Sequence, residues 1–390
     1  MSSSAPFSPA PITPCSSHTP PASDLSIPPV KVTRLGCGLP KMLCFDRYSF
    51  VVGGLIGEGG FGRVISALLE GTNKWYAIKI ICKRRQYGTS GPGRIGIFYE
   101  RDVMRQADCY NLPFVNRLLA SWDDSEHVYL VMPLYQRNLI SWIRERELYT
   151  IECYDNILQV ATVELIQSLE ALWSTGYIHR DIKPDNIMQD RNGHLILCDF
   201  GLAIPITHPP SPLVGTLCYM APEIQSSDPV RYTHKSDIWS LGVVLLEMHL
   251  RRSMSYFGSC IDCTDNEILQ QVQHRTINFN AIHDDLARDL IRSMLQRDPE
   301  RRCTLNEIKQ HPYFEIKCWD SSRRQRMSDE DVSSPMRFPK AVELKPSCPP
   351  VYSSLNYESI CQGLTEDAEN THMYSHISVR FLDQGVIPRF

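Results

Sequence analysis

The pattern of apolar residues changes once along this chain, and that change limits its fold more than any other feature. Up to about residue 132 there are β-branched or aromatic runs separated by glycine turns, namely Val51–Ile56, Arg63–Leu69, Trp75–Cys82 and His127–Met132. From about Asn138, longer stretches with helical spacing follow, namely Ile157–Thr175, Ile238–His249, Ala287–Gln296 and Leu305–Gln310. One earlier segment, Phe98–Gln106, also has helical spacing. This order predicts an α+β fold with a small β-rich lobe, a larger helical lobe and a cleft between them.

The two ends of the chain differ in composition from its middle. Residues 1–30 contain eight prolines among serine, threonine and alanine, so we expect residues 1–46 to form a disordered arm. Patterned sequence fills residues 47–314, and residues 315–390 are expected to be a tail that is partly ordered at best. No basic start precedes an apolar run, and Ile238–Leu250 is too short for a bilayer that needs about 20 residues. The sequence therefore predicts a soluble protein with one large domain.

Charge and cysteine content narrow the environment and the partners. A net charge of −4 over 390 residues gives no reason to expect nucleic acid or a membrane surface as partner. Fourteen cysteines follow no repeating framework, which favours reduced thiols in the cytoplasm, the nucleus or both. Cys260 and Cys263 form a lone CxxC with no second pair at zinc spacing, so we interpret that spacing as chance.

A glycine-rich turn lies between two of the expected strands. Gly57-Glu-Gly-Gly-Phe-Gly-Arg-Val64 contains GxGxxG, in which missing Cβ atoms let backbone amides approach phosphate oxygens. Dinucleotide-binding folds share this spacing, but there a helix follows, whereas here a strand follows. Fifteen residues after Val64 comes Tyr-Ala-Ile-Lys79, which taken alone could be a surface lysine closing an amphipathic strand.

Two further motifs make the interpretation specific. His179-Arg-Asp-Ile-Lys-Pro-Asp-Asn186 is followed by Asp199-Phe-Gly201, and both come after the glycine turn and Lys79, within a match of about 265 residues. In kind and order these motifs resemble the eukaryotic protein kinase family of serine/threonine type. The resemblance implies a two-lobed fold, ATP and Mg²⁺ as cofactors, and protein substrates.

The resemblance also assigns roles to individual residues. It implies that Asp181 orients the substrate hydroxyl, that Lys183 lies beside the transferring phosphate, and that Lys79 reaches the α- and β-phosphates. Asn186 and Asp199 would hold Mg²⁺, which prefers oxygen ligands. Glu100, 21 residues after Lys79, is the expected ion-pair partner of Lys79.

The resemblance places the nucleotide between the lobes. The residues that it assigns to the nucleotide pocket, besides Lys79 and Glu100, are Ile56, Gly57, Gly59, Gly62, Val64, Ala77, Met132, Pro133, Tyr135 and Met188. Met132 would close the back of the adenine pocket, and adenine would bond to backbone groups near Pro133 and Tyr135. Gln136-Arg-Asn138 replaces the family's usual segment here, so a ribose-binding carboxylate is missing.

Other matching positions are expected to be structural. Thr216 should lie near Asp181 and Lys183, and with Lys183 it indicates serine/threonine specificity. Arg302 should pair with Glu223. Asp237 should anchor the catalytic loop. His179 should pack in the core against Phe200, together with Met104 and Leu118, rather than act as an acid or base.

Regulation and subfamily are less well marked. Arg180 before Asp181 is typical of kinases activated by a phosphate in the segment 199–223, so an upstream activating kinase is a possible partner. The usual acceptor position is Pro212 and an expected basic residue is Ile204, which leaves Ser211 and Thr207 as candidate sites. His311-Pro-Tyr-Phe314 resembles the start of the tail in AGC kinases.

Two other classes of protein share parts of this pattern with an active protein kinase. A pseudokinase that binds nucleotide as a scaffold would typically lack one of Lys79, Asp181, Asn186 or Asp199, and all four are present. A nucleotide-dependent enzyme of small molecules would lack Ala-Pro-Glu223 and Arg302. The sequence favours an active serine/threonine kinase.

Overall fold

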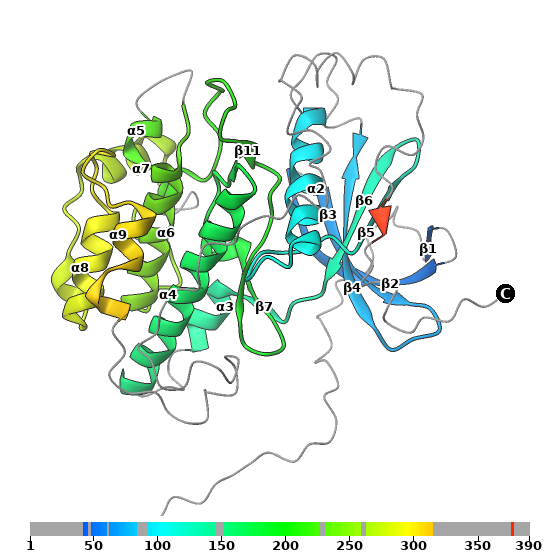
Figure 1. Cartoon of the computed structure of the whole chain (residues 1–390), viewed down its shortest axis with the longest axis horizontal. Coiled ribbons are helices and arrows are strands. Elements are labelled where there is room, and N and C mark those ends of the chain that lie inside the picture. Colours follow the sequence, from blue (N-terminus) through cyan, green and yellow to red (C-terminus); the bar gives the residue numbers. More distant parts are fainter. Residues whose placement is uncertain are drawn as a thin grey trace, which may run out of the picture.

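The structure is a computed structural model, and it consists of a β-rich lobe and a helical lobe (Figure 1). It describes residues 42–45, 48–60, 62–83, 93–145, 151–225, 231–258, 263–314 and 376–377. The sheet lobe comes first in the chain and the helical lobe follows, so the predicted α+β arrangement is confirmed.

The smaller lobe is built on a seven-stranded antiparallel sheet with the order β1-β2-β3-β4-β6-β5-β12. Its strands are β1 (Met42–Phe45), β2 (Tyr48–Gly59), β3 (Gly62–Leu69), β4 (Trp75–Cys82), β5 (Ala120–Asp123), β6 (His127–Pro133) and β12 (His376–Ile377). Helix α2 (Gly93–Cys109) lies beside this sheet, on the side toward the helical lobe (Figure 1).

The side chains of strand β4 lie on two faces of the sheet that have different surroundings. Successive side chains of a strand point to opposite faces. Lys79 and Ala77 therefore face one side, where α2 lies, while Tyr76 and Ile78 face the other. That other face is a separate apolar core with the Phe50 ring 6.1 Å from the Tyr76 ring.

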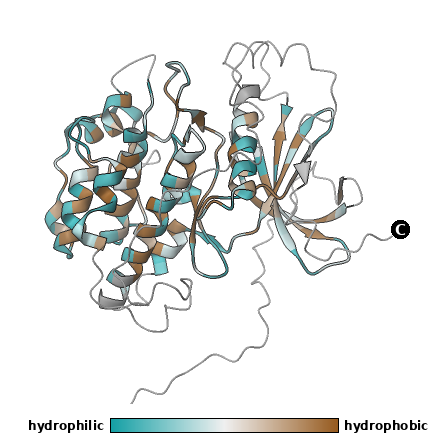
Figure 2. Ribbon diagram, viewed as in Figure 1, coloured by the Kyte–Doolittle hydropathy of each residue, from teal (hydrophilic) through white to brown (hydrophobic). Residues whose placement is uncertain are grey.

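The larger lobe is mostly helical. Its helices are α3 (Leu139–Arg144), α4 (Ile151–Ser174), α5 (Pro222–Gln225), α6 (His234–His249), α7 (Asp265–His274), α8 (Asp285–Met294) and α9 (Leu305–Lys309). Helix α6 is apolar on nearly all sides because it runs through the interior, and the apolar residues of Figure 2 gather there and on the neighbouring helix faces. Helix α4 begins six residues before the predicted Ile157.

Short strands and single helical turns link the lobes and carry the loops of the cleft. They are β7 (Arg137–Asn138), β8 (Tyr177–Ile178), β9 (Ile187–Gln189), β10 (Leu195–Leu197), β11 (Ile204–Pro205) and the turns Pro184–Asn186, Leu217–Tyr219, Phe279–Ala281 and Pro312–Phe314. Strand β9 pairs with β10 and β7, and β8 pairs with β11. These pairings fix the segments that carry Asp181, Asn186 and Asp199.

The N-terminal arm was predicted to extend to residue 46, and this bound is wrong because residues Met42–Phe45 form strand β1. Met42–Phe45 pairs with β2, with Leu43 opposite Phe50, and Leu43 is buried. Alternating Leu43 and Phe45 within Met-Leu-Cys-Phe is a strand signal that the proline-rich composition upstream obscured. Residues 1–41 lie outside the described residues, as does the predicted tail 315–390 apart from β12, which pairs with β5.

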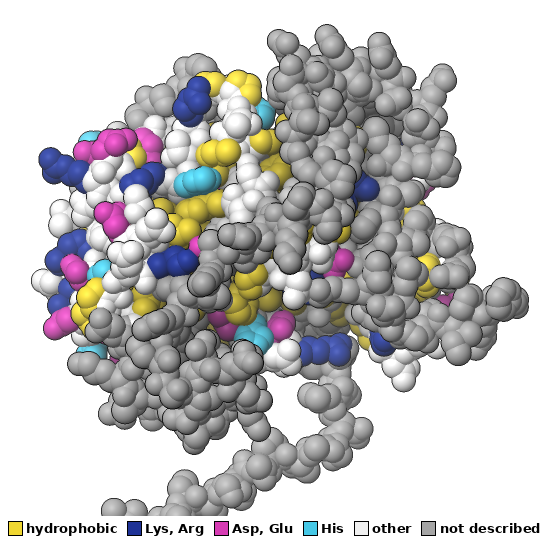
Figure 3. All heavy atoms as spheres, in the orientation of Figure 1, with side chains coloured by type: hydrophobic (Ala, Val, Ile, Leu, Met, Phe, Trp, Pro, Cys, Tyr) yellow, Lys and Arg dark blue, Asp and Glu magenta, His cyan; other side chains and the backbone are white. Residues whose placement is uncertain are grey.

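Several surface features concern the predicted partners. Within the described ranges, none of the helices is both long and apolar enough to span a bilayer. The same ranges hold no cluster of three His, Cys, Asp or Glu side chains suited to a metal ion, and Cys260 of the CxxC lies outside them. On the face of the helical lobe in Figure 3, Lys and Arg side chains are interspersed with Asp and Glu.

Candidate active site

A buried charge cluster lies where the two lobes meet. The Lys79 Nζ atom is 2.6 Å from Glu100 Oε1 and 2.7 Å from Asp199 Oδ1. Strand β4 supplies Lys79, α2 supplies Glu100, and the segment after β10 supplies Asp199. The predicted Lys79–Glu100 pair is therefore confirmed, and Glu100, which is 2% exposed, contacts the lysine.

The opposite charges of Lys79 and Asp199 stabilise each other. Burial alone would lower the pKa of Lys79, but the carboxylates of Asp199 and Glu100 raise it above its ordinary value. Burial would raise the pKa of Asp199, but the ammonium of Lys79 lowers it overall. At neutral pH the cleft therefore presents a protonated amine beside an ionised carboxylate, which suits the binding of phosphates and of a cation.

A second polar cluster surrounds Asp181 on the helical lobe. Its Oδ1 atom accepts hydrogen bonds from the Thr216 hydroxyl at 2.7 Å and the Thr216 amide at 3.1 Å. Its Oδ2 atom is 2.8 Å from Lys183 Nζ, which also donates to Thr216 Oγ1 at 2.9 Å. The predicted meeting of Asp181, Lys183 and Thr216 is confirmed.

Asn186 is held in one orientation by the same aspartate. Its Nδ2 donates to the Asp181 carbonyl at 2.8 Å and to Asp181 Oδ2 at 3.1 Å. Both bonds use the amide nitrogen, so the Oδ1 oxygen is directed elsewhere. With the carboxylate of Asp199, the donor set is made of oxygen atoms, which fits Mg²⁺ and does not fit softer metals.

Helix α6 anchors the loop that carries Asp181 through the side chain of Asp237. Asp237 accepts the backbone N–H groups of His179 at 2.9 Å and Arg180 at 3.0 Å, and it is fully buried. Arg180 has φ of 69° and Asp199 has φ of 59°, which are left-handed conformations that a non-glycine residue adopts only when its surroundings impose them. The expectation that Asp237 anchors the catalytic loop is thus confirmed.

His179 belongs to the core, as predicted. Its ring lies 5.3 Å from the Phe200 ring, and His179 and Phe200 are both fully buried. Met104 and Leu118 belong to the same buried cluster as Phe200. This packing places Phe200 inward and therefore directs Asp199 toward Lys79.

The glycine turn is the hairpin between β2 and β3, with Gly57 opposite Val64 and Gly59 opposite Gly62. A Cβ atom added at Gly57 or Gly59 would meet no protein atom within 4 Å. Packing within the described protein therefore does not require glycine at these two positions. A ligand that approaches the backbone closely would require it, and a triphosphate is such a ligand.

The residues assigned to the adenine pocket come from β4, from the end of β6 and from the link to the helical lobe. Ala77 pairs with Met132 across β4 and β6, and Pro133 ends β6. The Tyr135 hydroxyl donates to Asn116 Oδ1 at 3.0 Å, so its ring is fixed.

Cys198, just before Asp199, is buried, and burial raises its pKa well above the ordinary value, which keeps the thiol protonated and unreactive.

Two further positions assigned to the nucleotide pocket lie in β2 and β9. Ile56 lies near the end of β2, 39% exposed, and Met188 lies in β9. Neither position contradicts the prediction, and all of the assigned residues occupy the hairpin, β4, α2, the end of β6 with the link that follows it, or β9.

The segment after Asp199 is tied to the catalytic loop through Arg180. Its guanidinium donates to the Leu202 carbonyl at 2.6 Å and to the Ser211 hydroxyl at 3.1 Å, and it lies over the Tyr232 ring at 4.9 Å. A Cβ atom on Gly215 would come within 2.7 Å of the Arg180 carbonyl oxygen, at a φ of 119°. The segment therefore lies against the catalytic loop at two points.

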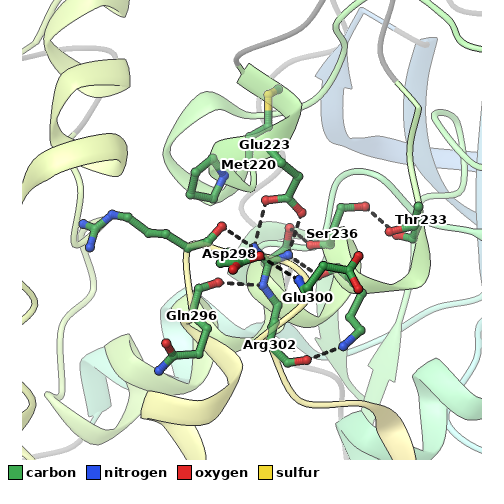
Figure 4. A network of polar contacts seen from close by, with 12 residues as sticks. Met220, Glu223, Thr233, Ser236, Gln296, Asp298, Glu300 and Arg302 are labelled. Atoms are coloured by element: carbon green, nitrogen blue, oxygen red, sulfur yellow. Dashed lines mark hydrogen bonds and ion pairs between the residues drawn. The ribbon is translucent and has the colours of Figure 1, made fainter.

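The predicted Glu223–Arg302 pair is confirmed as the centre of a network in the helical lobe (Figure 4). Arg302 Nη1 and Nη2 donate to the two carboxylate oxygens of Glu223 at 2.6 and 2.8 Å. The guanidinium also donates to backbone carbonyls of Gln296 and Lys235, at 3.0 and 2.7 Å. The Arg302 side chain is fully buried, so the network has a structural role.

Sequence reasoning missed a group of tyrosines at the junction of the lobes. Tyr177 and Tyr99 pack ring to ring at 5.7 Å, and Tyr177 donates to Asp102 on α2 at 2.9 Å. Tyr232 stacks with Arg180. No motif marks these residues, because their partners lie far away in the sequence and tyrosine is common in cores.

Comparison with known proteins agrees with this geometry. The family model for the protein kinase domain matches residues 50–314. The chain is 33% identical over 290 residues to serine/threonine-protein kinase YPK2/YKR2 of Saccharomyces cerevisiae, covering 72% of this chain and 40% of the relative.

Two further relatives show the range of similarity. Serine/threonine-protein kinase gad8 of Schizosaccharomyces pombe is 32% identical over 272 residues, which is 68% of this chain and 45% of gad8. Protein kinase C delta type of Mus musculus is 27% identical over 342 residues, which is 84% of this chain and 47% of that protein. The chain thus spans less than half the length of these three relatives in the aligned regions.

Proposed function

The chain belongs to the protein kinase domain family, and on that premise we propose that it is an active serine/threonine protein kinase using ATP and Mg²⁺. The observation that carries the proposal is the convergence of Lys79, Glu100 and Asp199 in one buried cluster, on the cleft that also holds Asp181. The relatives, which include a protein kinase C and two yeast kinases, support an AGC-like type.

The residues of the cleft divide the work of phosphoryl transfer, which is mainly positioning and charge neutralisation. Lys79 binds the α- and β-phosphates of ATP, and Glu100 keeps Lys79 in place. The β2–β3 hairpin covers the phosphates with its backbone. Asp181 accepts or orients the proton of the substrate hydroxyl, and Lys183 stabilises the negative charge that develops beside it.

Asn186 Oδ1 and the Asp199 carboxylate are the oxygen donors that would hold Mg²⁺. Bound there, the ion neutralises phosphate charge. Asp181 contributes indirectly, because its carbonyl and carboxylate both accept from the Asn186 amide and so fix the direction of Oδ1.

Thr216 supports specificity for serine and threonine. Its hydroxyl lies between Asp181 and Lys183, at 2.7 and 2.9 Å, and so narrows the space beside the base. An aliphatic hydroxyl on a short side chain can reach Asp181 with its backbone outside this space. A tyrosine hydroxyl lies about 6 Å from its Cα, so its backbone would be poorly placed for the near-attack geometry that transfer needs.

The pseudokinase alternative has no observation in its favour, since the described cleft retains Lys79, Asp181, Asn186 and Asp199 in one arrangement. A radiolabelled-ATP assay on a mixed protein substrate, followed by phosphoamino-acid analysis, tests the proposal. We expect label in phosphoserine and phosphothreonine. Absence of transfer would overturn the kinase activity, and abundant phosphotyrosine would overturn the specificity alone.

Regulation by an upstream kinase is proposed to act through Ser211 and not Thr207. Arg180 already donates to the Ser211 hydroxyl, whereas Thr207 is exposed on the other side of Pro209. A phosphate on Ser211 would form charge-assisted bonds with the same guanidinium. Phosphatase treatment of protein from a eukaryotic host should lower the activity of the wild type and leave Ser211→Ala unchanged; equal losses in both would refute this site.

For location we propose the cytoplasm, the nucleus or both. The cysteines within the described ranges are free thiols, which supports a reducing compartment. Fluorescence microscopy of the tagged chain tests this, and accumulation in the secretory pathway would contradict it.

A further inference from the structure

A buried polar contact joins α2 directly to the loop that carries Asp181. Tyr177, in β8, donates its hydroxyl to Asp102 Oδ2 at 2.9 Å, across 75 residues of sequence. Tyr177 lies four residues before Asp181 and is paired with Pro205 of the segment that follows Asp199. A single hydroxyl therefore links the helix of the small lobe to both catalytic segments of the large lobe.

Asp102 collects three donors in a dry environment. Besides Tyr177, Gln106 Nε2 donates to its Oδ2 at 2.8 Å and Arg105 donates to its Oδ1 at 3.1 Å. Asp102, Arg105 and Gln106 are each only 5–6% exposed. Burying such polar groups is costly unless they are hydrogen-bonded, so this side of α2 is packed inward only while its bonds are made.

The Tyr177–Asp102 contact and the Lys79–Glu100 pair lie on different sides of α2. Glu100 and Asp102 are two residues apart on α2, which places them about 200° apart around the helix axis. Glu100 faces Lys79 while Asp102 faces Tyr177. Tyr177 can therefore influence Glu100 only through the position of the helix as a whole.

The bond favours one position of α2 over others. When α2 lies against the large lobe, the Tyr177 hydroxyl compensates for the burial of Asp102, and the Tyr99 ring packs on the rings of Tyr177 and His208 at 5.7 and 6.4 Å. When α2 moves away, Asp102 is hydrated by water and Tyr177 contributes nothing to it. An interaction present in only one of two states shifts the population toward that state.

We propose that Tyr177, through Asp102, is a positioning residue that holds α2 where Glu100 pairs with Lys79. The inference rests on the proposed kinase function. It extends that function by identifying an interlobe link outside the residues that contact nucleotide, metal or substrate.

The test replaces a single hydroxyl. Tyr177→Phe keeps the ring and leaves Asp102 with its Gln106 and Arg105 bonds, so the domain should fold. Tyr154→Phe is the matched control, because the Tyr154 hydroxyl also makes a buried bond of 2.9 Å, to the Met248 carbonyl inside the helical lobe. Both variants lose one buried hydrogen bond, but only the first loses a link to α2.

Two readouts separate positioning from general stability. In hydrogen–deuterium exchange, Tyr177→Phe should speed exchange in peptides covering residues 97–108, and Tyr154→Phe should not. In steady-state kinetics, Tyr177→Phe should lower kcat/KM at least about tenfold, in line with the loss of a hydrogen bond to a charged group. Combined with Glu100→Gln, it should cause no further loss, because both changes act on the same ion pair.

The results of these experiments distinguish failure of the positioning role of Tyr177 from failure of the proposed kinase function. Unchanged exchange in α2, or a kinetic loss that adds fully to that of Glu100→Gln, would overturn the positioning role. Absence of transfer by the wild type would overturn the proposed function alone, since the exchange comparison of the two tyrosine variants still decides whether Tyr177 holds α2.

Discussion

Two of the buried ion-pair clusters within the described residues have similar distances but connect different parts of the structure. Lys79 in the cleft meets Glu100 and Asp199 at 2.6 and 2.7 Å, and these three residues come from the sheet, from α2 and from the large lobe. Arg302 meets Glu223 with two bonds of 2.6 and 2.8 Å, and its other acceptors also lie in the helical lobe. The first cluster therefore depends on how the lobes are arranged, whereas the second stabilises one lobe.

This difference shows what burial can and cannot indicate. A perturbed, buried charge is a candidate for function, but structural ion pairs are equally buried. The distinguishing features here are the number of elements joined and access to the cleft: the Asp199 side chain is 38% exposed, whereas the Arg302 side chain is 0% exposed. We therefore expect mutations at the two sites to separate activity from stability.

The largest expected effect is on activity at the cleft pair. Lys79→Met and Asp199→Asn should each lower kcat/KM by about 1,000-fold, because each removes a charge that acts on the transferring phosphate. Retention of more than about a tenth of the wild-type kcat/KM in either variant would show that the role assigned to that residue is wrong.

A large effect on stability is expected at the other pair. Arg302→Ala should lower the free energy of unfolding by about 3 kcal/mol or more, because it leaves Glu223 and several buried carbonyls without their donor. Arg301→Ala is the matched control: the Arg301 side chain is 81% exposed and lies 3.6 Å from Asp298, so its loss should be within about 0.5 kcal/mol. Urea unfolding of both variants measures this, and equal losses would refute the structural role of the Arg302 network.

The buried carboxyl of Glu247 in α6 gives a third site to compare, because burial outweighs the nearby charge of Arg252 in setting its pKa. Burial raises the pKa of Glu247 from 4.5 to about 8, and it accepts from the Tyr219 hydroxyl at 2.9 Å and the Tyr256 amide at 2.7 Å. Between these two pKa values the folded protein keeps a proton that the unfolded chain loses. Stability should therefore fall as the pH rises from about 4.5 to about 8.

Glu247→Gln removes that titration and should flatten this part of the pH profile, by on the order of 5 kcal/mol over the whole range. Asp199, whose pKa is lowered mainly by Lys79 against the effect of burial, contributes stability that is lost only in a more acidic range, below its ordinary value of 3.8. Melting temperatures across the pH range provide the measurement. A Glu247→Gln profile parallel to that of the wild type would contradict the assignment.

Much of the fold and the cleft could be predicted, because their signals are local. The β-branched and aromatic run Trp75–Cys82 and the apolar run Ile238–His249 depend on neighbouring residues, and both elements were predicted close to their observed bounds. The motifs around Asp181 and Asp199 are likewise short. Pairs between distant residues, such as Glu223 with Arg302, were predictable only through the family resemblance.

The features that could not be predicted from the sequence depend on contacts between distant segments, and no motif indicates such contacts. The link between Tyr177 and Asp102 spans 75 residues, and Asp102 in a helical segment is indistinguishable from a solvated carboxylate. Strand β1 was missed because composition upstream outweighed a four-residue alternation. The Tyr177–Asp102 bond and the pairing of β1 can be identified only in the folded structure, where segments distant in sequence pack together.

The most direct test of the central claim measures activity and folding on the same samples of Lys79→Met and Arg302→Ala at a low temperature. We expect Lys79→Met to be folded, with a melting temperature near that of the wild type, and inactive. We expect that Arg302→Ala melts much earlier but, per folded molecule, transfers phosphate within about fivefold of the wild type. A Lys79→Met protein that unfolds as readily as Arg302→Ala, or a folded Arg302→Ala protein without activity, would contradict the central claim.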